Sequence, residues 1–129
     1  MADEAYHPLY LRGIAEFNRR NFFQSHEVWE ELWLSESGPA RKFYKGLIQA
    51  AVALHHLSRG NAHGATRLLA GSTGYLEAYR SRYLGLDVDG FLASLDKYVT
   101  TELEATGGGC PACVGSVDVP QIRLERSAE

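Results

Sequence analysis

The segment FFQSHEVWEELW, residues 22–33, decides how the rest of the chain is interpreted. On an α-helix, side chains three and four residues apart share a face. Trp29 and Trp33, the two tryptophans of the chain, therefore share one helix face with His26 and Glu30. We expect this face to be buried, because helical proteins place their large aromatic side chains in the core. An unpaired carboxylate is costly in such a place, so Glu30 is expected to have a partner there.

The composition is that of an ordinary globular domain. The chain has 129 residues, of which 45% are hydrophobic and 22% are charged, enough for one core without stabilising crosslinks. Its net charge of −3 and its scattered basic residues argue against nucleic-acid or anionic membrane partners. The most apolar stretch, residues 47–57, is far shorter than the roughly 20 residues that span a bilayer. The acidic start, residues 1–4, does not resemble a signal peptide, so a cytoplasmic protein is expected.

Helical periodicity and capping residues predict an all-α fold, a single compact bundle of about five helices. No segment alternates strongly enough to predict a strand. The bundle is expected to occupy residues 1–105, followed by a Gly-rich link and an irregular C-terminal tail over residues 106–129. The expected helices begin at Pro8, after Asn21 (to about Ser35), after Ser37-Gly38-Pro39, at Asn61 (to about Leu84), and at Asp87 or Asp89.

The third expected helix is predicted to be the central one. It carries two adjacent apolar stripes, so a wide arc of its surface must be covered by other helices. The fourth expected helix contains Gly71 and Gly74, which either break it or let another backbone come close. The two stripes comprise Phe43, Leu47, Ala50, Leu54 and Leu57, and Tyr44, Ile48, Ala51 and His55.

A polar site is predicted where the second and third helices meet. His26 and Glu30 are four residues apart, so their side chains adjoin, and antiparallel packing of the two helices would bring His55 toward them. Two imidazoles and a carboxylate are a common ligand set for zinc or a similar divalent metal ion. The same three groups could instead form a metal-free general base, or His26 and Glu30 could be a structural pair that fixes helix packing.

The two cysteines form a C-x-x-C pair, Cys110 and Cys113, after three consecutive glycines. A thioredoxin-like pair would instead follow a strand and open a helix. As a zinc site, the pair supplies only half of the usual ligands. A structural or incidental role in a loop is therefore favoured.

Several motifs together resemble a known family. The pattern H-x-x-x-E-x-x-W (His26, Glu30, Trp33) is accompanied by Phe22-Phe23, by Gly46–Ala50 leading to His55, and by Gly60-Asn61. Over roughly residues 10–85, the sequence resembles the small prokaryotic family known as domain of unknown function 309. The resemblance implies a compact α-helical fold and a metal-binding role for the residues of the pattern, and it implies no established activity.

Two hypotheses follow. In the first, His26, Glu30 and His55 bind a divalent metal ion, with Trp29, Trp33 and Tyr44 supporting the site. An enzyme built on this site would carry out metal-assisted hydrolysis of an unidentified small-molecule substrate, although a non-catalytic protein is favoured. In the second, the protein is an interaction module or homo-oligomer in which the His–Glu pair only fixes helix packing. If one bundle cannot cover both apolar stripes of the third helix, the remaining surface would be buried between subunits.

Overall fold

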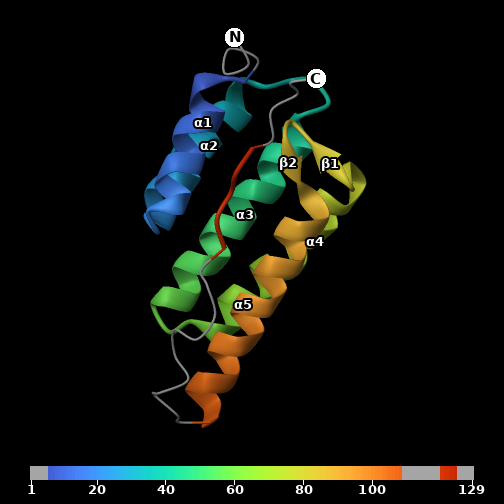
Figure 1. Cartoon of the computed structure of the whole chain (residues 1–129). Helices are drawn as coiled ribbons and strands as arrows, with labels where there is room; N and C mark the ends of the chain where they lie inside the picture. Colours follow the sequence, from blue (N-terminus) through green and yellow to red (C-terminus); the bar gives the residue numbers. More distant parts are fainter. Residues whose placement is uncertain (1–5, 109–119, 125–129) are drawn as a thin grey trace.

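The computed structural model describes residues 6–108 and 120–124, with side chains described up to residue 104 and again from residue 120. The prediction of an all-α bundle is confirmed, with five α-helices and a small hairpin in this part of the chain (Figure 1). Its elements are α1 (Pro8–Asn18), α2 (Phe22–Ser35), α3 (Arg41–Ser58), α4 (Ala62–Leu76), the 3-10 helix η2 (Glu77–Tyr79), β1 (Arg82–Tyr83), β2 (Leu86–Asp87) and α5 (Val88–Gly108).

Helix α3 occupies the centre of the bundle, as predicted. It lies between α2 and α4 and contacts both along much of its length (Figure 1). Half of its 18 residues are buried. Burial on two sides leaves only a narrow strip of α3 open to solvent, which is the behaviour expected of a helix with a wide apolar arc.

Two helix starts that the sequence predicted, at Asn61 and at Asp87, carry side-chain caps, and His7 caps α1 as well. His7 Nδ1 accepts a hydrogen bond from the Leu9 N–H (3.0 Å) at the start of α1. Asp87 Oδ1 accepts from the Gly90 N–H (3.1 Å) at the start of α5, and Asn61 caps α4. Such contacts satisfy N–H groups that have no partner within the first helical turn. Asn21, in contrast, makes no side-chain capping hydrogen bond to α2 and serves as part of the connection from α1.

The prediction for the fourth helix is wrong at its C-terminal end. Helix α4 ends at Leu76 rather than near Leu84, and η2 and an antiparallel hairpin follow it. The hairpin turns at Leu84 and Gly85, whose φ angles of 48° and 78° are left-handed. Two successive left-handed residues reverse the chain tightly between paired strands. The expectation that no strand is present is therefore corrected by this two-residue pair of strands.

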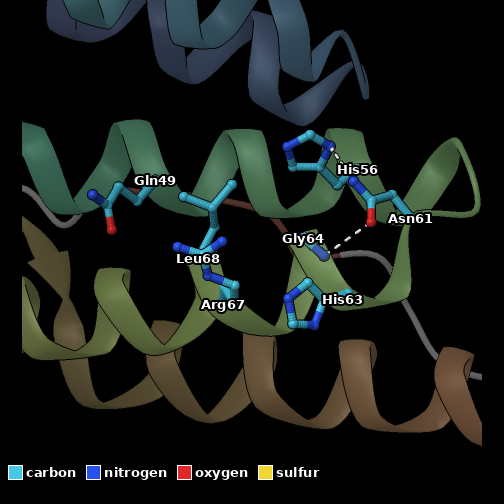
Figure 2. Close-up of a pocket in the computed structure, with 7 residues that line it drawn as sticks. All are labelled: Gln49, His56, Asn61, His63, Gly64, Arg67 and Leu68. Carbon is cyan, nitrogen blue, oxygen red and sulfur yellow. Dashed lines mark hydrogen bonds between the residues drawn. The ribbon is translucent and has the colours of Figure 1, made fainter.

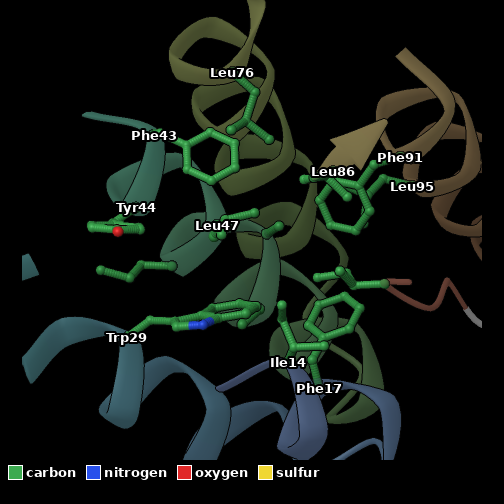
Figure 3. Packing of buried hydrophobic residues seen from close by; sticks show 14 of the residues in the cluster. Ile14, Phe17, Trp29, Phe43, Tyr44, Leu47, Leu76, Leu86, Phe91 and Leu95 are labelled. Atoms are coloured by element: carbon green, nitrogen blue, oxygen red, sulfur yellow. The ribbon is translucent and has the colours of Figure 1, made fainter. Parts of the chain in front are cut away.

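The core combines aromatic and aliphatic side chains from several helices (Figure 3). Trp29 is fully buried, and its ring lies 5.8 Å from that of Phe17. Phe17 in turn contacts Phe22 and Phe91, so α1, α2 and α5 share one cluster. Aromatic pairs at these separations stabilise a core beyond the area that they bury.

Serine and glycine form a matching contact at two helix–helix interfaces. Ser25 Oγ of α2 donates to the Gly13 carbonyl of α1 (2.9 Å), and Ser72 Oγ of α4 donates to the Gly46 carbonyl of α3 (2.8 Å). Both serines are fully buried. A glycine lets the neighbouring helix come close enough for a short side chain to reach its backbone. These contacts hold α2 against α1 and α4 against α3.

The glycines of α4 act differently from the prediction. The helix continues through both Gly71 and Gly74. Gly71 makes room for the side chain of Gln49, and a Cβ at Gly74 would have open space around it. Gly46 of α3 likewise makes room for side-chain atoms, those of Leu76 and Tyr75 on α4.

The segment 120–124 runs alongside the bundle as an extended strap (Figure 1). The Asn18 side chain binds the backbone of Ile122 twice, donating to its carbonyl (2.9 Å) and accepting from its N–H (2.8 Å). Pro120 and Ile122 are buried. Helix α5 continues to Gly108, past the predicted end of the bundle at residue 105, and the division into bundle and tail stays a prediction. Cys110 and Cys113 lie outside the described ranges, so the prediction for them also stays untested.

Candidate functional site

His26 lies at the edge of α2 that adjoins α3, and its side chain is 20% exposed. Its Nδ1 is 2.8 Å from the Phe23 carbonyl oxygen. A carbonyl can only accept, so Nδ1 carries the proton in this contact. In the neutral imidazole, Nε2 is then the nitrogen with a lone pair, the atom that can accept a proton or bind a metal ion.

The prediction that Glu30 lies on the buried face of the second helix is wrong. Its side chain is 51% exposed, and Oε1 is 3.9 Å from His26 Nε2. The buried face of α2 is instead formed by Phe22, Ser25, Trp29 and Leu32. Glu30 lies beyond His26 on the solvent side of that face. An exposed carboxylate keeps its hydration, so Glu30 needs no buried partner.

The two imidazoles meet around a side chain that the sequence did not single out. The Phe23 ring lies 5.0 Å from the His26 ring and 5.3 Å from the His55 ring, measured between centroids. The predicted convergence of His55 on the second helix is therefore confirmed, with Phe23 as the common contact. Neighbouring residues point about 100° apart on a helix, so Phe22 is buried while Phe23 is exposed.

The pKa of His55 is lowered from its ordinary value of 6.5. Burial is the main cause, followed by the positive charge of Arg59 and by His56 and His26. Burial and nearby cations both disfavour the protonated imidazole.

We expect His55 to make the folded protein less stable as the pH falls. The unfolded chain binds the proton more readily than the folded one, so stability is retained above pH 6.5 and lost as the pH falls through the folded-state pKa. NMR titration of the His55 ring should give a midpoint below 6.5. Arg59→Gln should raise that midpoint, because it removes a neighbouring positive charge. A midpoint at or above 6.5 in the unmodified protein would contradict the burial of His55.

The residues named as supporting the site have other contacts. Tyr44 packs against Tyr10, with ring centroids 5.9 Å apart, and burial raises its pKa to about 12. Trp29 belongs to the core. Trp33 is half-buried and lies beneath two cations, the Arg41 guanidinium 3.8 Å and the Lys45 ammonium 4.6 Å from its ring centroids. These cation–π contacts join the end of α2 to the start of α3.

The possible metal ligands do not come together into a metal site in the part of the chain that the structure describes. There, no three His, Cys, Asp or Glu side chains lie close enough together to hold a metal ion. His26 and Glu30 adjoin, but His55 packs on Phe23 rather than completing a ligand set. Metal binding by His26, Glu30 and His55 stays a prediction, which equilibrium dialysis with zinc would test.

The fold and this site define a small helical-bundle domain. Phe23, His26 and His55 form a surface cluster on it, called here the imidazole–aromatic cluster. Comparison with known proteins shows which family this domain is similar to. Residues 10–68 match the model of the family described as Domain of unknown function (DUF309). The matched range contains His26, Glu30 and His55.

Two curated relatives extend the comparison. An uncharacterized protein of Bacillus subtilis, YpuF, is 37% identical over 102 residues, which cover 77% of this chain and 59% of the relative. An uncharacterized protein of Aquifex aeolicus is 28% identical over 87 residues, which cover 67% of this chain and 26% of the relative. The chain thus spans less than two thirds of the length of either relative. Among the helices of the described ranges, none is long and apolar enough to cross a membrane.

Proposed function

We propose that the chain is a non-catalytic protein-interaction module whose contact surface is the outer face of α2. This outer face comprises Phe23, Glu27, Glu30, Glu31 and Leu34. Among the described residues, Phe23 (45%) and Leu34 (69%) are the large hydrophobic side chains that are exposed. That both come from one face of one helix is the observation that carries the proposal, because clustered exposed apolar groups mark interaction sites.

The charge of the outer face indicates the kind of partner. Helix α2 contributes three glutamates and contains no lysine or arginine. A symmetric dimer through this face would bring the glutamates of one copy against those of the other, because such an interface pairs identical patches. Like charges facing each other across an interface are unfavourable. The partner that fits is therefore an amphipathic segment of another protein, with apolar residues on one side and lysine or arginine beside them.

The imidazole–aromatic cluster would orient this surface. The Phe23 ring is held between His26 and His55, so it is presented to a partner in a fixed position. A side chain that is already ordered loses less entropy on binding. The His26–Glu30 pair then fixes local structure and needs no catalytic role, in line with the second hypothesis from the sequence.

The test uses a synthetic helical peptide with leucines on one face and lysines on the other, and a scrambled peptide of equal composition. The amphipathic peptide should bind saturably by fluorescence anisotropy, and the scrambled one should not. The double variant Phe23→Ser, Leu34→Ser should bind at least tenfold more weakly and melt within a few degrees of the unmodified protein, because exposed positions contribute little to stability.

A control for the change of side chain is Leu92→Ser on α5, a partly buried leucine that lies away from the outer face. It should leave peptide binding unchanged. Equal binding by the double variant would overturn the proposal. Light scattering that shows a dimer abolished by the same double variant would also overturn it, because the surface would then be covered by a second copy. Metal-assisted hydrolysis and a cytoplasmic location stay predictions beside this proposal.

A further inference from the structure

A second feature lies away from the outer face of α2, between α3 and α4. It is a cavity of about 460 Å³ at the end of the bundle where α3 passes into α4 (Figure 2). Gln49 and His56 line it from α3, Asn61 from the connection, and His63, Arg67 and Leu68 from α4. We propose that this cavity binds a small organic anion through its phosphate or carboxylate group.

Two hydrogen bonds fix the polar groups of the cavity (Figure 2). Asn61 Oδ1 accepts from the Gly64 N–H (2.9 Å), which settles the orientation of its amide. Asn61 Nδ2, 3.2 Å from His56 Nδ1, must then be the donor in that contact. Nδ1 of a neutral His56 is thus the acceptor, and its ring proton resides on Nε2. His56 therefore offers an N–H donor even when it is uncharged.

Two glycines of α4 make room for the two amide side chains. A Cβ at Gly64 would lie 2.6 Å from Asn61 Nδ2. A Cβ at Gly71 would overlap the Gln49 carboxamide oxygen. Glycine is unfavourable within a helix, so its presence at both points is explained by the space that Asn61 and Gln49 require. This space is an observation independent of the charges around the cavity.

The chemistry of the lining selects an anion. Arg67 is permanently charged, and His56, His63, Asn61 and Gln49 all offer N–H donors. No carboxylate is among the residues that line the cavity. Arginine binds planar or tetrahedral oxyanions with several parallel hydrogen bonds.

The size of the cavity and its apolar wall indicate a ligand larger than an inorganic ion. The cavity volume lies within the range of roughly 300–1,000 Å³ typical of small-molecule sites. Leu68 supplies an apolar surface beside the donors. An oxyanion on a small carbon skeleton would use both.

The test is an NMR titration of the intact ¹⁵N-labelled protein at constant pH and ionic strength, with chloride as the balancing ion. Inorganic phosphate and acetate are the two probes. We expect saturable shifts at the His56 and His63 rings and at the Gly64 amide with at least one probe. Saturation at lower concentration with phosphate assigns a phosphate-bearing ligand, and with acetate a carboxylate-bearing one.

Three variants make the test specific. Arg67→Gln should weaken binding of the favoured probe at least tenfold, and Gly64→Ala should weaken it by displacing Asn61 while Arg67 stays in place. Arg12→Gln, which removes an exposed arginine on α1, should leave binding unchanged. Shifts that rise linearly without saturation, or that persist equally in folded Arg67→Gln, would overturn the proposal. Peptide binding by the outer face of α2 should be unaffected by Arg67→Gln, so the two proposals fail separately.

Discussion

Trp29→Ala is expected to lower the free energy of unfolding by about 4 kcal/mol, the largest effect of any single substitution considered for this chain. The indole is fully buried and contacts the Phe17 ring. Its Nε1 donates to the Tyr10 carbonyl of α1 (3.2 Å). Truncation removes this hydrogen bond and the contacts of the indole with α1, and it leaves a cavity between α1 and α2. Urea unfolding followed by circular dichroism measures the change.

Trp33→Ala is the matched control for this experiment. Trp33 is half-buried and contacts Arg41 and Lys45 through its ring face. Its removal should cost about 1–2 kcal/mol, because part of its area is already exposed and two cation–π contacts are lost. Equal losses for the two tryptophans would show that the core is not centred on Trp29.

Gly13→Ala is expected to lower the free energy of unfolding by about 3 kcal/mol, although alanine is the better helix former. A Cβ at Gly13 would overlap the pyrrole part of the Trp29 indole. The ring cannot move aside without leaving its place beside Phe17 and breaking its hydrogen bond to Tyr10. Helices α1 and α2 would have to separate, which would also stretch the contact from Ser25 to the Gly13 carbonyl.

Gly74→Ala provides the opposite case within the same chain. Nothing lies within 4 Å of a Cβ built there, and the residue belongs to α4. Alanine should therefore stabilise the protein by about 0.5–1 kcal/mol, through helix propensity and a less flexible unfolded chain. Thermal melts of both variants measure this contrast. A stabilising Gly13→Ala would mean that Trp29 does not pack on α1 as the structure shows.

Periodicity predicted the helices well because each has a clear apolar arc, and three of them have a recognisable start. Pro8, Asn61 and Asp87 mark helix starts through local chemistry, which the sequence carries directly. The hairpin was missed for the converse reason. Its strands have two residues each, too few to show alternation, and Leu84 adopts a left-handed φ that its side chain gives no reason to expect.

The candidate site was predicted in part. The four-residue spacing of His26 and Glu30 correctly placed them side by side, and antiparallel packing correctly brought His55 toward them. The burial of Glu30 could not be predicted reliably. Successive residues turn by about 100°, so a small rotation of the helix about its axis moves an edge residue from the core to solvent.

The bidentate contact between Asn18 and Ile122 has a practical consequence for shortened forms of this protein. A chain that stops before Pro120 would leave the Asn18 amide to be solvated by water and would strip two buried apolar side chains from the surface of the bundle. The newly exposed apolar patch would promote self-association, because exposed apolar surface is buried when two molecules associate. Truncation after the last helix is therefore expected to give a protein that aggregates more readily than the full chain.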